Sequence, residues 1–142
     1  MIRVDLPQDK VFNGDHLQGR VEWSSSGKEP RKIEVICRWR LDGSGKKSTE
    51  IVKRVVEDNI ASRSQITIPF DFAIPLRGPI SYGGKLFSVI WEIFVNVDLP
   101  LAFDEEETRT FTVRARPYDP KEFDELDEDE EDDEDEDVER QT

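Results

Sequence analysis

Histidine and cysteine most often carry catalysis or bind metals, and this chain of 142 residues contains one of each. His16 follows the Asn13-Gly14 pair, and no second histidine or cysteine stands near it at metal-ligand spacing. A Ser-His-acid or Cys-His pair would have to use His16, yet no serine lies in a G-x-S-x-G context. We therefore expect a surface histidine beside a turn, no metal, no cofactor and no enzymatic activity.

Cys37 and the segment GSGKKS (residues 43–48) are the other two candidates for chemistry. Cys37 lies among apolar residues that recur at every second position, where a buried thiol behaves as a small hydrophobe. GSGKKS is similar to a phosphate-binding loop, but Arg40 occupies the position five residues before Gly45, where such a loop requires glycine. We expect a core cysteine and a hairpin turn.

The charge of the chain is divided unevenly. The net charge is −13, yet residues 117–142 carry 16 acidic side chains against Lys121 and Arg140, so residues 1–116 are left near +1. Residues 124–137 are almost wholly Asp and Glu, with too little apolar area to offset the entropy of ordering. No D-x-[DN]-x-[DN]-G loop is present to form a calcium site. We expect a folded domain over residues 1–116 and a disordered acidic tail over residues 117–142.

Basic residues gather in one part of the body. From Arg31 to Arg54 the sequence has eight basic residues and three acidic ones, a net of +5. The candidate docking residues are Lys32, Arg38, Arg40, Lys46, Lys47, Lys53 and Arg54. They form either an ordinary solvated face of a sheet or a docking surface for an anionic segment. That segment would be an acidic part of a partner or the protein's own tail. Exposed ion pairs contribute little and are screened by salt, so contact with the tail would be weak and salt-sensitive.

Strict alternation of apolar and polar residues predicts the strands that carry these side chains. In residues 32–41 the odd-numbered positions are apolar, and Ile36 is the exception on the polar face. Alternation also predicts strands within residues 2–6, 17–23, 66–74 and 111–115. Residues 48–56 form a less regular predicted strand, with Lys53 and Arg54 exposed on one face or the other. Pro69 cannot donate to a ladder, so its strand should lie at a sheet edge or carry a break.

Residues 83–100, GGKLFSVIWEIFVNVDLP, fit both a helical and a strand period. Ser88, Glu92 and Asn96 fall four apart, whereas the odd-numbered positions from 87 to 99 are all apolar. β-branched and aromatic residues dominate the segment, Gly83-Gly84 precedes it and Pro100 follows it, which favours one long, bent or bulged strand. Residues 86–99 are also too short and too polar for a membrane helix, which needs about 20 apolar residues.

Seven predicted strands with turn signals between them favour an all-β, immunoglobulin-like sandwich of two sheets. Trp23, Trp39 and Trp91 all fall on apolar strand faces, where we expect them to anchor the two sheets to each other. A polar turn around residues 104–107 should precede the last strand.

The order of these motifs resembles that of the arrestin-like β-sandwich domains. VFNGDHLQGRVEW (residues 11–23) resembles the family's early strand pair, in which a Gly-containing turn precedes a strand with a second Gly two residues before a Val. IPFDFAIPLRGPISYGGKLFSVIWEIFVNVDLP (residues 68–100) is similar to the most diagnostic part of the family. That part has an F-x-I-P strand end, a Pro, a Ser-Tyr-x-Gly turn, and a long strand with a central aromatic residue that closes on Asp-x-Pro.

Arrestins join two such sandwiches, whereas this chain has length for one, so it resembles short, single-domain bacterial relatives. The resemblance covers most of residues 1–116 and implies a non-catalytic adaptor or scaffold. It does not identify a ligand.

We expect a cytoplasmic, non-enzymatic binding module that recognises a protein partner through a sheet edge or a loop end. Residues 1–7 lack the features of a secretory signal. As an alternative, the tail is a polyanion that binds basic proteins or mimics nucleic acid, with the sandwich as its carrier, or it serves only to keep the protein soluble. Nucleic-acid binding by the body is not expected, since the tail would compete with phosphate for the basic residues.

Overall fold

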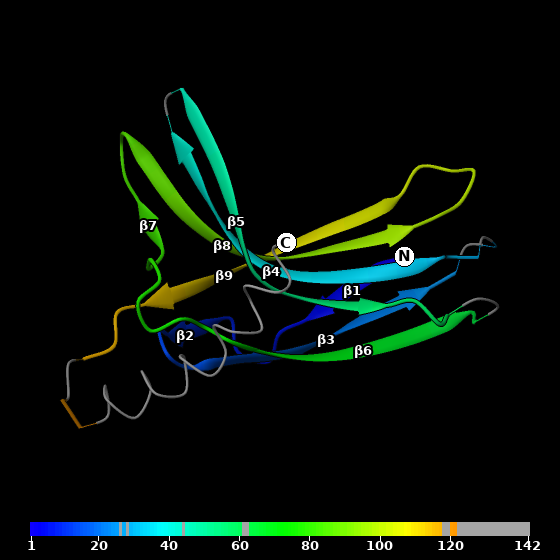
Figure 1. Ribbon diagram of the computed structural model, residues 1–142, viewed down its shortest axis with the longest axis horizontal. Coiled ribbons are helices and arrows are strands. Elements are labelled where there is room, and N and C mark those ends of the chain that lie inside the picture. The colour runs from blue at the N-terminus through cyan, green and yellow to red at the C-terminus, as the bar shows by residue number, and fades with distance from the viewer. Residues whose placement is uncertain (26, 28, 44, 61–62, 118–119, 122–142) are drawn as a thin grey trace.

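The computed structural model describes residues 1–25, 27, 29–43, 45–60, 63–117 and 120–121. In this part of the chain nine strands form two sheets that pack face to face (Figure 1). The all-β, two-sheet sandwich is therefore confirmed. The expected number of about seven strands omitted β2 (Lys10–Phe12) and β7 (Tyr82–Gly83), which have three and two residues and are too short for alternation to show.

The smaller sheet contains β1 (Ile2–Asp5), β3 (His16–Ser24) and β6 (Gln65–Ala73) in that order, all antiparallel. From Gln65 to Phe72, β6 buries every second side chain. Pro69 lies opposite Arg20 in this strand, which is at the edge of the sheet. Because a missing N–H is tolerated at a free edge, the prediction for Pro69 is confirmed.

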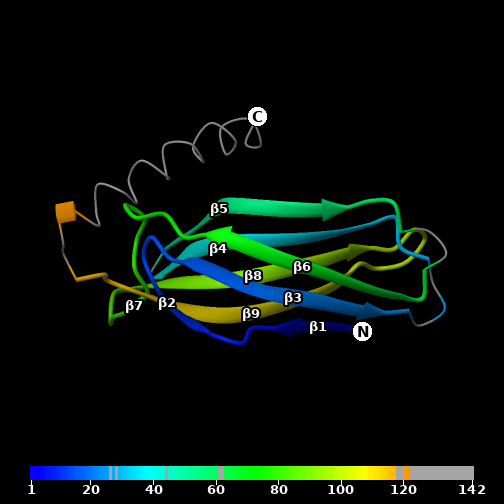
Figure 2. The ribbon, with the colours of Figure 1, turned by 90° about the horizontal axis from the view of Figure 1, so that it is seen from below.

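The larger sheet has the order β2, β9, β8, β4, β5, with β7 paired to the start of β8. Its main strands are β4 (Lys32–Gly43), β5 (Lys46–Glu57), β8 (Phe87–Asp98) and β9 (Glu105–Arg114). These main strands pair antiparallel, whereas β2 runs parallel to β9. Figure 2 shows the three strands of the smaller sheet lying across the larger one.

The core lies between the sheets and includes two of the three tryptophans. Trp91 is fully buried, and its Nε1 donates to the Pro79 carbonyl at 2.9 Å. Trp23 is nearly as buried, and its Nε1 donates to Glu105 Oε2 at 3.0 Å. Trp39 is half-buried and packs against the core from one side. Since a buried indole N–H needs an acceptor, these two hydrogen bonds fix the central anchors.

Gly19 stands where β3 passes close to other parts of the core. A Cβ at this position would meet the Asp5 carbonyl oxygen at 2.5 Å and Phe70 Cζ at 2.7 Å. No side chain fits in that space, so the middle of the strand requires glycine.

The segment with two competing periods is a strand over its central part, β8, as expected. It pairs with β4 without any shift in register from Phe87 to Asp98. The turn that follows lies earlier than expected, because β9 already begins at Glu105. The described residues contain no apolar helix of membrane-spanning length.

Candidate anion-docking site at the bend of the larger sheet

The larger sheet bends near its middle. The second half of β4, the first half of β5 and the first part of β8 rise away from the smaller sheet (Figure 1), so the outer face of the larger sheet lies on the inner side of the bend. A β-bulge coincides with this region: Cys37 pairs with Lys53 and Arg38 with Ile51, which leaves Val52 as an extra residue in β5. Because a bulge bends its strand and increases the twist, the extra residue in β5 accounts for a bend at this position.

Glu92 is at the centre of the outer face near this bend. Its side chain is only 2 % exposed, the one charged residue among the described buried side chains. Arg38 Nε donates to Glu92 Oε1 at 2.8 Å, and Arg40 Nε donates to Glu92 Oε2 at 3.3 Å. An ionised carboxylate can be buried only when it is paired and hydrogen-bonded in this way. We call Arg38, Arg40, Glu92 and Phe94 the bend cluster.

Strand register brings the members of the bend cluster together. Arg38 lies directly opposite Glu92, and Arg40 is two residues further along β4 on the same face. Opposite residues in antiparallel strands have neighbouring side chains on one face, so two guanidinium groups reach one carboxylate. The guanidinium of Arg38 also lies over the Phe94 ring, 4.1 Å from its centroid, which adds a cation–π contact.

The two arginines have more N–H donors than their hydrogen bonds to Glu92 and Asp42 use. Arg40 Nη1 donates to Asp42 Oδ2 at 3.3 Å, whereas Arg38 uses only Nε in its hydrogen bond to Glu92. The Arg38 side chain is 23 % exposed and that of Arg40 is 36 % exposed. A guanidinium presents five N–H donors in a planar fork that suits carboxylates and phosphates. Glu92 therefore orients two cationic groups whose remaining donors can bind an anion.

The other predicted docking residues do not all join the bend cluster. Lys47 lies opposite Asp42 near the hairpin turn and Arg54 lies opposite Ile36, both on the outer face. Lys53 lies opposite Cys37, on the face toward the smaller sheet, because the bulge reverses the alternation. For Lys46 the structure describes the backbone but not the side chain.

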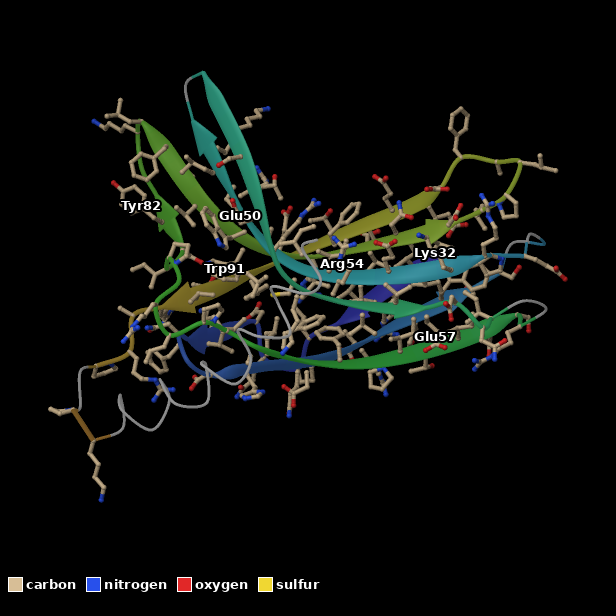
Figure 3. All side chains as sticks on the ribbon, viewed as in Figure 1. Lys32, Glu50, Arg54, Glu57, Tyr82 and Trp91 are labelled. Carbon is tan, nitrogen blue, oxygen red and sulfur yellow. The ribbon has the colours of Figure 1, made fainter. Side chains whose placement is uncertain are left out.

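Lys32 is separate from the rest of the set. It lies six residues before Arg38, about 20 Å along the strand, and its Nζ is 3.0 Å from Glu34 Oε1. Figure 3 shows Glu50 in the raised part of the sheet, Arg54 near the bend and Lys32 toward the other end. The structure thus brings together Arg38, Arg40 and Arg54 with Lys47 above them, and leaves out Lys32 and Lys53.

Three residues at this site were not predicted from the sequence to belong to it: Glu92, Phe94 and Ile36. Glu92 was expected on the polar face of β8 together with Ser88 and Asn96, and the face is correct, but its burial was not expected. Ile36, the exception to alternation in β4, is buried on the outer face between Phe94 and Arg54. The signal in the sequence is an acid in an apolar strand that faces a strand with arginines at alternate positions.

His16 and Cys37 lie where the sequence predicted them. His16 is exposed at the start of β3, with Nδ1 2.6 Å from Asp71 Oδ1. A hydrogen bond from Gln18, and then the hydrogen bond and charge of His16, hold the pKa of Asp71 below its ordinary value, although partial burial opposes this. Cys37 is fully buried, and burial raises the pKa of its thiol to about 12. The described residues contain no group of three or more potential metal ligands.

Of the acidic tail, the structure describes only Pro117, Pro120 and Lys121. The expected disorder of residues 117–142, and their expected contact with the basic hairpin, therefore fall almost wholly outside the described residues.

No family model matches the sequence, and no curated protein matches it. Among solved structures, the chain is similar to Spo0M, a sporulation control protein from Bacillus subtilis, with a TM-score of 0.65 and 21 % sequence identity. The similarity covers 82 % of this chain and 49 % of the Spo0M chain, so this protein spans about half the length of that structure. The chain therefore has an arrestin-like fold.

Proposed function

We propose that this protein is a non-enzymatic, regulatory binding module that docks an acidic peptide segment on the outer face of its larger sheet. The arrestin-like fold and the likeness to a sporulation control protein support a regulatory role. The protein's own acidic tail, or an acidic segment of a partner, would occupy the same surface in turn. The protein would act as a cytoplasmic adaptor, and its own tail would regulate the access of a partner to the docking surface.

The bend cluster is the observation that carries this proposal. Glu92 accepts a hydrogen bond from Nε of both Arg38 and Arg40, and both arginine side chains remain partly exposed. Hydrogen bonds between a guanidinium and a carboxylate are about twice as strong as neutral ones. Since Lys47 and Arg54 share the same face, the local charge favours a segment that carries several carboxylates.

An extended segment fits the shape of this surface. β5 has 12 residues and lies at one edge of the larger sheet. A peptide that lies along it in extended form can add main-chain hydrogen bonds to the carboxylate contacts. Basic side chains such as Lys47 and Arg54 on β5 discourage pairing with an unrelated apolar strand. Selectivity for an acidic segment then follows from charge and from strand pairing together.

The second candidate function assigns the binding to the tail. The tail carries a net charge of −14 while the body is near +1, which suits a polyanion attached to a carrier domain. Such a tail would bind basic proteins directly, without using Arg38 or Arg40. The two candidates therefore differ in which part of the chain a bound partner contacts.

A titration with a defined peptide separates the two candidates. A fluorescent peptide with the sequence of residues 124–137 is added at low salt to the chain ending at Arg116, and its anisotropy is followed. We expect saturable binding that is lost at high salt, because screening acts over about 8 Å at physiological ionic strength. The full chain should bind the peptide more weakly, since its own tail competes.

Charge reversal on the outer face provides the matched comparison. The double variant Lys47→Glu with Arg54→Glu should bind the peptide about tenfold more weakly or worse. The control Arg3→Glu with Lys10→Glu makes the same change in net charge on exposed residues of β1 and β2. Equal losses in both variants would show that only net charge attracts the peptide and would refute the docking site.

A further inference from the structure

The turn between β8 and β9 exposes two large apolar side chains. Leu101 and Phe103 have relative accessibilities of 107 % and 98 %, the highest among the exposed large apolar residues of the described chain. Neither side chain buries any appreciable surface against its own domain. Single exposed apolar residues are common on protein surfaces, but two fully exposed ones at one turn form a patch that needs a reason.

The backbone conformation of this turn is unfavourable for a leucine at position 101. Ala102 N donates to the Leu99 carbonyl at 3.4 Å, with Pro100 and Leu101 between them. Leu101 has a φ of 61°, and it is the one non-glycine residue at positive φ in the described part of the chain. This is the pattern of a type II turn, whose third position normally holds Gly or Asn. A leucine in this conformation is strained, so the domain gains no stability from it.

The base of the turn is nevertheless held firmly. Leu99 is 4 % exposed and belongs to the core, and Ala102 packs against the same core. Asp104 Oδ1 accepts a hydrogen bond from Leu99 N at 3.3 Å. The two exposed side chains therefore project from a fixed frame. Strained, exposed residues on a fixed frame are typical of positions that contact another molecule.

Carboxylates surround this turn. Asp104, Glu106 and Glu107 are all exposed, and Glu106 Oε1 accepts one long hydrogen bond, 3.4 Å, from Asn96 Nδ2. Two other acids already have cationic partners: Glu105 binds the N-terminal ammonium at 3.1 Å, and Asp98 binds Arg31 at 3.3 Å. The surroundings of Leu101 and Phe103 therefore attract positive charge.

We propose that the tip formed by Leu101 and Phe103 docks into an apolar pocket of a partner protein whose rim carries Lys and Arg. Large side chains buried at the centre of an interface supply most of its binding energy, and a charged rim supplies orientation and association rate. A lipid surface fits less well, because anionic headgroups repel the carboxylates next to the tip. This surface lies beyond the far end of β8 from the raised part of the sheet, so it is independent of the bend cluster.

Photo-crosslinking in the native cell tests the proposal. A photo-reactive benzoyl-phenylalanine is placed at position 103 of the full chain and, in a control, at position 86, where Leu86 is 77 % exposed and precedes β8. We expect an adduct with one protein from position 103 and not from position 86. That protein is then purified, and its affinity for the full chain is measured.

The affinity measurements decide what kind of contact forms. Phe103→Ser should weaken binding about tenfold or more, and Glu106→Lys with Glu107→Lys should do the same and reduce the salt dependence. Leu86→Ser, which removes another exposed apolar side chain, should leave the affinity unchanged. An unchanged melting temperature for Phe103→Ser excludes unfolding as the cause.

Four results would overturn the proposal. The first is the absence of an adduct specific to position 103, and the second is an adduct between two copies of this chain. The third is binding that the charge reversal does not weaken. The fourth is sedimentation of the full chain with phosphatidylcholine–phosphatidylserine vesicles that depends on Phe103, which would show that the tip contacts lipid.

Discussion

Arg38 Nε lies 2.8 Å from Oε1 of Glu92, and this carboxylate is almost completely buried on what is otherwise the outer face of the larger sheet. The pair joins β4 to β8 next to the bulge and the bend. Because Glu92 is buried away from water, the local dielectric is low and its carboxylate interacts strongly with the two arginines that it binds. The pair thus links the local stability of the sheet to the orientation of the docking donors.

Replacing Glu92 by Gln should lower the free energy of unfolding by about 2 kcal/mol. The amide cannot accept from both arginines, and its NH2 group opposes one guanidinium, although partial exposure of Arg38 and Arg40 moderates the loss. Urea unfolding of both proteins gives the difference. The control Glu106→Gln changes an exposed carboxylate on β9 and should cost less than about 0.5 kcal/mol. Similar losses in both variants would mean that Glu92 has no special structural role.

Cys37 should make stability depend on pH in the alkaline range. Burial raises the pKa of its thiol from an ordinary 9.0 to about 12, although the charge of Lys53 opposes this. The folded state holds the proton more tightly than the unfolded state, so this contribution is complete below pH 9. It is lost as the pH rises from about 9 toward about 12, by about 1.4 kcal/mol per unit.

The Cys37→Ser variant isolates this effect, since serine does not titrate in that range. The free energy of unfolding of the wild type minus that of the variant should decrease as the pH rises above 9 and stay constant below pH 9. In the folded wild type, iodoacetamide at pH 8 should modify Cys37 only after urea is added. Rapid modification of the native protein would place the thiol at the surface.

Replacing Leu101 by Asn should leave the domain as stable as the wild type or more stable, by up to about 1 kcal/mol. Asparagine tolerates positive φ, and the exposed leucine side chain makes no packing contribution that could be lost. Leu99→Ala, two residues earlier, should instead cost about 2–4 kcal/mol because it leaves a cavity in the core. Denaturant unfolding compares the two. A loss above about 1 kcal/mol for Leu101→Asn would show that leucine stabilises the turn.

Replacing Gly19 by Ala should destabilise the domain by about 2 kcal/mol or more. The new methyl group would overlap the Asp5 carbonyl oxygen and the Phe70 ring, and the carbonyl oxygen belongs to the backbone of β1. Gly83→Ala is the matched control, because its methyl group would meet nothing within 4 Å. Thermal unfolding of both variants checks the prediction. Equal melting temperatures would show that β1 and β3 separate easily.

The long strands were predictable because their two faces differ in environment. β4, β6 and β8 each have one face against the core, so alternation in the sequence reports their structure directly. β2 and β7 were missed because two or three residues carry no period. The turn before β9 was placed too late because Glu105, Glu106 and Glu107 look like loop residues, although Glu105 is held by Trp23 and the N-terminus.

The composition of the site was predictable only in part. The sequence identified Arg38 and Arg40 as basic residues on one face of a strand, and the structure places them there. It did not predict the bulge at Val52, which turns Lys53 to the opposite face. It also could not show that Glu92 is buried, because burial on the outer face depends on side chains from β4 that are far away in sequence.

The exposed tip at Leu101 and Phe103 had no signature in the sequence. Both residues follow an apolar strand and could have been its continuation. Their exposure depends on the turn at Pro100, after which the chain reverses into β9.

Chemical-shift mapping tests the central claim most directly. The chain ending at Arg116 is labelled with nitrogen-15 and titrated at low salt with the peptide of residues 124–137, and its spectra are also compared with those of the full chain. We predict shifts in the side-chain Nε–H signals of Arg38 and Arg40 and in the amides of β5, with the same signals displaced in the full chain. Shifts spread evenly over all exposed basic residues, or confined to the smaller sheet, would contradict the docking site at the bend.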